Sequence, residues 1–439
     1  MRSMLNIIKK IILRDLVWFP LVKNTFLYSF WHRFNGKLAN MLYGSPSSQM
    51  FVIGVTGTDG KTTTCNLIHH IIQSNLWDCV MISTANIKFG TQTTFNDTKM
   101  TSLNIFDLQK LLSQAKSQDI NYAVVETSSH GWSQSRFEWV SFSLGALTNI
   151  TAEHLDYHQD INDYANTKKK LFLNVIKNNL PNKLGVLPKD DEFGRKRLSE
   201  IIFDKQLDYG INLSSTLKAE NIVEHLDHTE FDIKYLGQSH HVVLKLAAKF
   251  NVYNALAATA TALLMGISLD KIIIALQTFE PVDGRVNLFE HKGVHYIVDF
   301  AHTPAALQSL LEYANTTKWT GRTITVFGAP WLRDTYKRPE MWKIVWRLSD
   351  IVIVTEDDSQ TEDTATIIND IVAWVGRNEG DNFFVQPIRE HALKLAIDLA
   401  QPGDLVLCAG KGHERYLLTN YGKITWNDTD KLKEYLEIT

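Results

Sequence analysis

The residues best suited to chemistry lie in the stretch 52–64, which reads VIGVTGTDGKTTT. Its apolar β-branched run predicts a buried strand, and the residues after the glycine-rich turn predict a helix. Glycines at such a turn let backbone N–H groups surround phosphate oxygens, and the helix N-terminus adds partial positive charge. Lys61 could then reach the β- and γ-phosphates while the Thr62 hydroxyl binds Mg²⁺. Val55 replaces the first glycine of the usual pattern, yet this order of elements predicts ATP binding rather than an ordinary turn.

Further polar clusters follow apolar runs in the first half of the chain. Glu126 ends one such run, where a carboxylate could bind Mg²⁺ beside the phosphate turn, although a residue so placed is more often solvated or a cap. His154 and His158 stand four residues apart and could share a helix face as metal ligands, which is a weak pattern. Read from the residues alone, Lys168 and its lysine neighbours indicate a solvated basic helix face.

The second half holds three clusters of the same kind. They are residues 299–304 (DFAHTP), 333–339 (RDTYKRP) and 410–414 (GKGHE), each placed after an apolar run. The cations Arg333, Lys337 and Arg338 suit an anionic substrate or a developing phosphate charge. Ligands of open α/β sheets bind at the carboxyl ends of the strands. Polar clusters repeated after strands therefore predict a binding site more strongly than any one of them does.

The elements that position these residues alternate between strand and helix patterns, which predicts an α/β fold. Residues 49–284 predict a central, phosphate-loop-type ATP-binding domain with a mostly parallel sheet, and 220–246 an antiparallel insertion within it. Residues 285–439 predict a C-terminal, Rossmann-like α/β domain. The expected strands are 50–55, 79–83, 122–126, 144–148, 296–299, 323–327, 351–355 and 404–408, with helices at 65–74, 105–118 and 254–265.

Residues 1–48 predict a short helical segment that is rich in aromatic residues, among them Trp18, Phe19, Phe26 and Trp31. Charged residues interrupt its apolar run, so we expect it to be too short for a membrane span. A cleavable signal sequence is not expected either, because the run contains lysines and lacks a small-residue cleavage site. Packing on the next domain is favoured over an amphipathic helix lying on a membrane surface.

Composition excludes several classes of protein. The 439 residues carry a formal net charge of −3, without the basic excess of a general nucleic-acid binder. Three cysteines (Cys65, Cys79 and Cys408) are far apart in the sequence and form neither a metal motif nor a disulfide framework. A reducing, cytoplasmic location is therefore expected. We further expect small-molecule substrates and a monomer.

Taken together, these motifs resemble the Mur ligase family, most closely its muramyl-tripeptide synthetases, from about residue 50 to the C-terminus. The resemblance implies ATP-dependent amide ligation in the synthesis of peptidoglycan precursors. ATP would phosphorylate a substrate carboxylate, and the amine of an amino acid would attack the acyl phosphate. Such phosphoryl transfer depends on positioning and on neutralisation of charge by Mg²⁺ and cations.

The resemblance also implies roles for individual residues. The family's catalytic residues are matched by Lys61, Glu126, His154 and Lys168. Its magnesium ligands are matched by Thr62, Glu126, His154 and Lys168, the last as a carbamate. The nucleotide-binding positions are Gly57, Thr58, Asp59, Gly60, Lys61, Thr62, Thr63, Asn251, Asn254, Arg285 and Asp299. The acceptor positions are Thr101, Ser102, Ser128, Gln134 and Arg136, and those for the incoming amino acid are Arg338, Asp357, Asp358, Gly410 and Glu414.

Two departures from the family pattern affect the substrates. Enzymes that use diaminopimelate carry Asp-Asn-Pro-Arg, whose arginine clamps a carboxylate, whereas residues 357–360 here read DDSQ. Without a guanidinium fork the bidentate contact is lost, so lysine or another diamino acid fits as well. The family also has an N-terminal uridine-binding domain of roughly a hundred residues, which the 48 residues before the first strand cannot form.

That second departure leaves the acceptor open. The chain could act on a muramyl peptide, or it could be a related ligase acting on a folate or poly-amino-acid acceptor. A non-catalytic nucleotide-binding subunit is a third interpretation, which the retained Lys61, Glu126, His154 and Lys168 disfavour.

Overall fold

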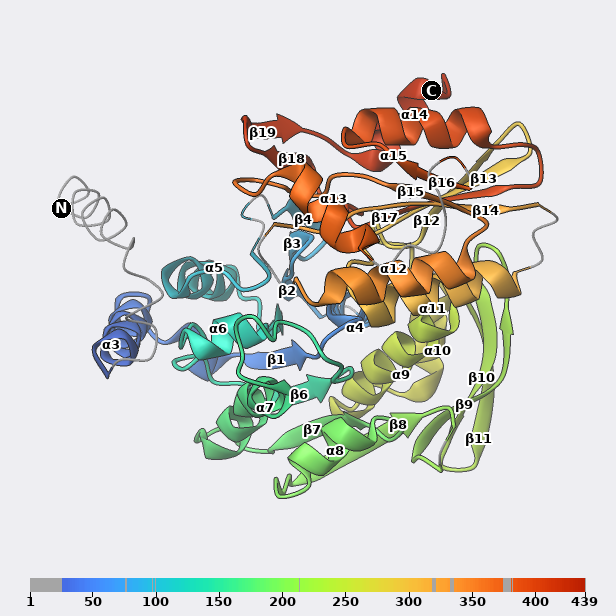
Figure 1. The fold of residues 1–439 in the computed structure, drawn as a ribbon. Coiled ribbons are helices and arrows are strands. Elements are labelled where there is room, and N and C mark those ends of the chain that lie inside the picture. The colour runs from blue at the N-terminus through green and yellow to red at the C-terminus, as the bar shows by residue number, and fades with distance from the viewer. Residues whose placement is uncertain are drawn as a thin grey trace.

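The protein is described here by a computed structural model that covers residues 26–438, apart from 76, 97, 99, 213, 318–320, 332–334, 374–379 and 381. Two units, each a sheet between layers of helices, lie against one another (Figure 1). The α/β class expected from the alternating pattern is confirmed. The predicted boundary at 284/285 falls between the last helix of the first unit and the first strand of the second.

The first unit is built on an 11-stranded sheet in the order β11-β10-β9-β8-β7-β6-β1-β5-β2-β3-β4. Its centre, from β2 to β9, is parallel, and antiparallel hairpins extend it at both ends. Its strands are β1 Phe51–Thr56, β2 Cys79–Ile82, β3 Asn86–Phe89, β4 Gln92–Phe95, β5 Tyr122–Glu126, β6 Leu144–Leu147, β7 Leu184–Pro188, β8 Lys205–Gly210, β9 Leu217–Glu224, β10 Thr229–Tyr235 and β11 Gln238–Leu244.

Helices cover both faces of this sheet because neighbouring residues of its central strands are buried on opposite sides. In β1, Ile53 packs into one core with α4, α9 and α10, whereas Val52 packs into the other core with α5, α6, α7 and α8. Such double burial is expected of parallel strands. The helices are α4 Lys61–Ser74, α5 Ile105–Ser117, α6 Ser129–Ser133, α7 Ile161–Lys177, α8 Glu192–Leu198, α9 Lys249–Leu264 and α10 Leu269–Gln277.

The second unit is built on a 6-stranded sheet in the order β12-β13-β17-β14-β15-β16, parallel except for β12. Helices α11, α12 and α13 pack on one face, and α14 and α15 on the other. The strands are β12 Asn287–His291, β13 Val294–Asp299, β14 Thr323–Phe327, β15 Ile351–Val354, β16 Phe383–Val385 and β17 Leu405–Ala409, with the hairpin β18 Tyr416–Thr419 and β19 Gly422–Thr425 beside them. The helices are α11 Pro304–Thr316, α12 Lys337–Leu348, α13 Thr364–Val372, α14 Arg389–Leu399 and α15 Asp428–Tyr435.

Ahead of the first sheet, α3 Phe26–Leu42 and a 3₁₀ turn, Pro46–Gln49, precede β1. The helix is attached to the first unit: Trp139 Nε1 donates to Arg33 O at 3.1 Å, and Arg33 pairs with Glu138 at 3.0 Å. These contacts match the packed alternative for this segment. Trp18 and Phe19, two of the aromatic residues behind the membrane-surface alternative, lie outside the described residues. None of the described helices combines the length and apolar character needed to cross a bilayer.

Every strand named from the sequence is present to within two residues at each end, and the antiparallel insertion forms β9, β10 and β11. The hairpins β3–β4 and β18–β19 were not expected, and their exposed residues carry little hydrophobic signal. Strands β7, β8, β12 and β16 were not named from the sequence either. The helix expected from 254 begins earlier, at Lys249.

Candidate functional site

A cavity of about 970 Å³ lies between the two units. The first unit contributes the turn after β1, the end of β5, residues of α7 and the start of α9. The second unit contributes the segments that follow β13, β15 and β17. Because the carboxyl ends of parallel strands open onto this cavity, it is the expected ligand site of such sheets.

The turn between β1 and α4 requires glycine at two positions. Gly57 has φ +153° and Gly60 has φ +80°. A Cβ on Gly57 would lie 1.8 Å from Thr148 Oγ1, and one on Gly60 would lie 2.2 Å from Asn254 Oδ1. The backbone can therefore pass close to other elements and still present N–H groups at the start of α4, the arrangement that binds phosphate.

Lys61 and Thr62, the first residues of α4, both line the cavity. Lys61 Nζ donates to Thr58 O at 2.6 Å, which holds the ammonium over the turn. The Thr62 hydroxyl donates to Glu126 Oε2 at 3.0 Å and accepts from Arg285 Nη2 at 3.2 Å. This threonine therefore links the phosphate turn to β5 and to the second unit.

Glu126 is buried at the end of β5, with a relative exposure of 1%. Its carboxylate also accepts from the Thr84 backbone N–H and hydroxyl, each at 2.8 Å. The solvated or capping role weighed from the sequence is therefore wrong for this residue. A fixed carboxylate beside a threonine hydroxyl offers the hard oxygen ligands that Mg²⁺ prefers, so these side chains fit that ion.

Lys168 contradicts the solvated helix face expected from its lysine-rich surroundings. It lies on the buried side of α7, where Nζ donates to Gly57 O at 2.6 Å and sits 4.3 Å from the centre of the Tyr164 ring. Burial, and then the charge of Lys61, hold the pKa of Lys168 well below its usual range. A lowered pKa favours the unprotonated amine, and only the unprotonated amine is a nucleophile. Lys168 is therefore better suited to react as a nucleophile than the more exposed lysines beside it.

His154 and His158 do not share a helix, so that expectation is corrected. Residues 151–160 form turns, and His154 has φ +56°. The His154 ring lies edge-on to His130 with centroids 4.6 Å apart, whereas His158 Nδ1 lies 3.2 Å from Asp163. The tight turn aims only His154 at the cavity.

Glu153 is a buried carboxylate to which the sequence analysis assigned no role. It lies 3.6 Å from His154 Nε2 and 3.5 Å from His302 Nε2, so it joins the two units. Burial alone would raise the pKa of Glu153, but His154 and His302 hold it well below its usual range. Burial, and then the charge of Glu153, raise the pKa of Asp59 in the phosphate turn. The signal available in the sequence was its place beside His154 in a cluster that follows a strand.

The predicted nucleotide-side residues also reach the cavity. Asn254 Nδ2 donates to Asn251 Oδ1 at 2.9 Å at the start of α9. Asp299 accepts from backbone N–H groups at 2.7 and 2.8 Å, and burial raises its pKa. Arg285 stacks over Phe300, with the guanidinium 4.8 Å from the ring centre. All four predicted residues line the cavity; their contacts with ATP stay predictions.

Hydrogen bonds join four of the five acceptor-side residues, and Thr101 directly precedes one of the four, Ser102, in the chain. Ser102 Oγ lies 2.8 Å from Ser128 Oγ and accepts from the Ser128 N–H at 3.0 Å. Arg136 donates to Ser102 O and to Gln134 Oε1. Thr101 and Ser128 line the cavity. The structure thus brings together what the resemblance grouped, while binding of an acceptor stays a prediction.

Across the cavity, a cluster of carboxylates surrounds Lys411, a buried residue that the sequence analysis did not single out. Lys411 Nζ lies 2.7 Å from Asp358, 3.7 Å from Asp357 and within hydrogen-bond reach of Glu414. Burial alone would lower the pKa of Lys411, but its carboxylate neighbours raise it above its usual range. Gly410 has φ +105°, and a Cβ there would meet Asp357 at 2.6 Å.

Arg338 is a predicted site residue that the structure places away from the cavity. Its buried guanidinium pairs with Glu362 at 2.7 Å and Asp370 at 2.8 Å, and it is not among the described residues that line the cavity. Contact with an amino acid would require it to leave both carboxylates, so that role stays a prediction. Arg333, the other arginine of this cluster, lies outside the described residues.

Comparison with known proteins gives matches along most of the chain. Residues 55–262 match the family described as Mur ligase middle domain, and 284–412 that described as Mur ligase, glutamate ligase domain. The UDP-N-acetylmuramoyl-L-alanyl-D-glutamate--2,6-diaminopimelate ligase of Clostridium botulinum is 33% identical over 91% of this chain and 80% of its own length. The Bacillus cereus protein of that name is 34% identical, covering 94% and 82%. A solved structure of such a ligase is 27% identical, with a TM-score of 0.60 over 88% of this chain and 78% of that one.

Proposed function

Because this chain belongs to the Mur ligase family, whose members are ATP-dependent ligases that form C–N bonds, we propose that it joins a diamino acid to the carboxylate of a muramyl-dipeptide acceptor. One observation carries the proposal: the phosphate turn, Glu126 and Lys168 share a cavity with the acidic cluster around Lys411. An activated carboxylate and an incoming amine could therefore meet there. This role implies a cytoplasmic enzyme of peptidoglycan precursor synthesis.

The reaction proceeds in two steps. An oxygen of the acceptor carboxylate attacks the γ-phosphorus of ATP, the bond to the β-phosphate oxygen breaks, and ADP leaves. The amine of the amino acid then attacks the acyl carbon, phosphate leaves from the tetrahedral intermediate, and the amine loses a proton. Lys61 and Arg285, both beside Thr62, would offset phosphoryl charge in the first step.

Thr62, Glu126 and His154 would hold Mg²⁺, which supplies charge neutralisation at the phosphates. Lys168 would join them as a carbamate, formed when its neutral amine adds to carbon dioxide and releases a proton. The lowered pKa of Lys168 supports this modification because only the unprotonated amine is a nucleophile. An ammonium at that place would repel the ion, whereas a carbamate offers anionic oxygens.

The acidic cluster supports a substrate with a second amine. Among the described residues, Asp357, Asp358 and Glu414 bring three carboxylates against the ammonium of Lys411, so negative charge is in excess in this part of the cluster. A distal ammonium would offset this excess. The relatives named above are diaminopimelate ligases, but Gln360 stands where the family's carboxylate-clamping arginine is expected. We therefore propose lysine or ornithine alongside diaminopimelate as candidates.

An ADP-release assay tests the proposal. The purified chain is given ATP, Mg²⁺ and uridine-linked muramyl dipeptide, with lysine, ornithine or meso-diaminopimelate supplied in turn. We expect ADP only when both acceptor and amino acid are present, and no release from the Lys61→Ala variant. The same dipeptide without uridine diphosphate, a folate and a poly-amino acid are the alternative acceptors. If ADP is released with one of these alternative acceptors and not with the uridine-linked dipeptide, the substrate belongs to that acceptor class. ADP release without any acceptor would refute the ligase assignment.

A further inference from the structure

The hairpin joining β9 to β10 carries a group of side chains outside the cavity. Glu224 pairs with Thr229, so His225 and His228 face one another across the tight turn, where His225 N donates to His228 O at 2.9 Å. Glu230 lies two residues beyond His228 and therefore on the same face of β10. That face is turned to solvent, because its alternate residues are only partly buried.

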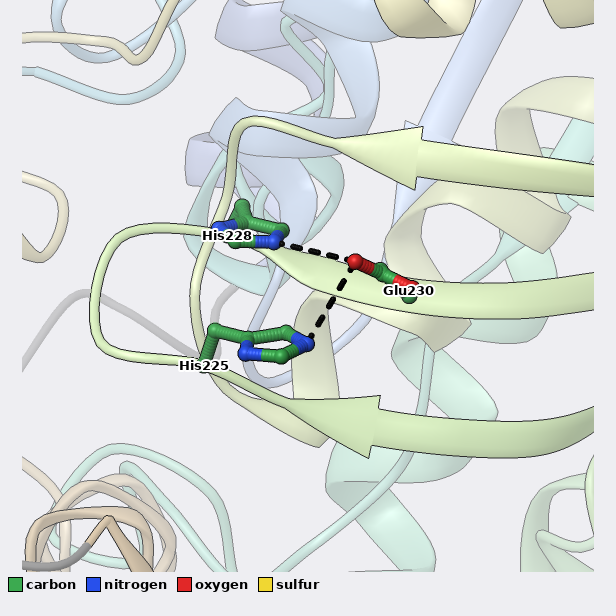
Figure 2. Close-up of side chains that lie close together, drawn as sticks. All are labelled: His225, His228 and Glu230. Atoms are coloured by element: carbon green, nitrogen blue, oxygen red, sulfur yellow. Dashed lines mark hydrogen bonds and ion pairs between the residues drawn. The ribbon is translucent and has the colours of Figure 1, made fainter.

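The ligand atoms of these three side chains lie within 4.8 Å of one another (Figure 2). The imidazole rings stack with centroids 4.2 Å apart and 9° between their planes. Glu230 Oε1 lies 3.5 Å from His225 Nε2 and 3.3 Å from His228 Nε2. A tetrahedral ion with bonds of 2.0–2.2 Å has ligand-to-ligand edges of about 3.3–3.6 Å. The two nitrogen-to-oxygen separations match these edges, and rotation of the rings about χ2 would aim both nitrogens at a shared ion.

The surroundings of the two rings also suit an ion. His228 Nδ1 lies 2.7 Å from Asp227 Oδ1, the contact that orients the ring and leaves Nε2 as the ligand atom. His225 Nε2 is shielded from solvent and has no hydrogen-bond partner among the described residues. Lone pairs on these nitrogens would face the Glu230 carboxylate across a short gap. A proton or a metal cation must therefore lie between each nitrogen and the Glu230 carboxylate.

We propose that His225, His228 and Glu230 bind a divalent transition-metal ion, with Zn²⁺ as the best match. Two imidazoles and one carboxylate are a known zinc ligand set, which leaves a fourth position for water. Nitrogen ligands select against Mg²⁺, which prefers oxygen. This site is therefore distinct from the magnesium site of the cavity, and it does not depend on the proposed ligase substrate.

An ion here would stiffen a joint between the two units. Within the same turn, Leu226 O accepts from Tyr313 Oη on α11 at 2.6 Å. Glu224 accepts from the N–H of Lys249 at 2.6 Å, at the start of the helix that carries Asn254. Both Glu224 and Tyr313 line the cavity, so the hairpin that would hold the ion also contributes to the cavity wall.

Zinc binding to the full-length chain, freed of metal by a chelator and kept in excess Mg²⁺, tests the proposal. Competition with a chromophoric chelator gives the stoichiometry and affinity, and Co²⁺ absorption reports the coordination geometry. We expect one Zn²⁺ per chain at this site, lost in the double variant His225→Gln/His228→Gln. Asp227→Asn should weaken binding about 10–100-fold. His391→Gln, which alters an exposed histidine on α14, is the matched control and should bind as the wild type does.

Zinc binding by the double variant also distinguishes this site from a site formed by the histidines of the cavity. Zinc held there would persist in the double variant and be displaced by ATP with Mg²⁺. If the double variant binds Zn²⁺ with the stoichiometry and affinity of the wild type, the proposal is wrong. Circular dichroism and the melting temperature establish that each variant is folded. If the double variant does not fold, Glu230→Gln decides: unchanged zinc affinity in that variant overturns the proposal.

Discussion

Replacing Lys168 by methionine would separate its chemical role from its structural one. Methionine keeps a long apolar stem but removes the amine that donates to Gly57 O. The carbonyl is left without its partner, which costs about 1–3 kcal/mol. A protein with an ordinary stability of about 5–15 kcal/mol remains folded after such a loss. We therefore expect a folded variant whose catalytic defect has another origin.

The expected defect is large. If the carbamate of Lys168 supports the charge that develops at the phosphates, kcat for ADP release should fall about 10²–10³-fold, as when one preorganised stabilising group is removed. Lys168→Ala should show the same loss and be partly restored by formate or acetate, whose carboxylate can enter the vacated space. The assay is amino-acid-dependent ADP release, with the melting temperature measured in parallel. An unchanged kcat in Lys168→Met would refute the carbamate assignment.

The lowered pKa of Lys168 adds a signature in the free energy of unfolding. The unfolded chain binds this proton up to pH of about 10.4, whereas the folded protein releases it at a lower pH. Stability therefore rises with pH between the folded and unfolded pKa values, by at most about 1.4 kcal/mol per pH unit. Lys168→Met should lack this rise in bicarbonate-free urea titrations. Parallel pH curves for the two proteins would contradict the lowered pKa.

Three further predictions concern the turn, the contact between units and the acidic cluster. Gly60→Ala, at φ +80° and against Asn254, should lower the free energy of unfolding in urea by about 1–2 kcal/mol; an unchanged midpoint would contradict the close packing. Arg285→Ala removes the contact with Thr62 and should lower kcat/KM for ATP by about tenfold or more in the ADP assay; an unaltered value would dismiss the cross-unit role. Lys411→Met leaves buried carboxylates without their cation and should cost about 3–5 kcal/mol in thermal unfolding; a stable variant would disprove that pairing.

The two sheets and the phosphate turn could be predicted from the chain alone because their signals are local. An apolar run bounded by turn residues identifies a buried strand, and the residues from Gly57 to Thr62 are contiguous. The polar clusters after β5, β13 and β17 could likewise be assigned to strand ends. Parallel strands place their carboxyl ends at one edge, so the general position of the site followed from order alone.

The protonation and partners of individual groups depended on the tertiary structure. Lys168 belongs to a run of lysines whose sequence predicts a solvated face, yet the packing of α7 on β1 buries that one amine against Gly57. Glu153 and Lys411 form ion pairs with residues that are distant in the sequence. Arg338 forms an ion pair with Glu362 within the second unit. Burial and long-range charge set these properties, and neither is encoded in local spacing. The sequence by itself determined the elements and the family, whereas the docking of one unit on the other decided which charges meet.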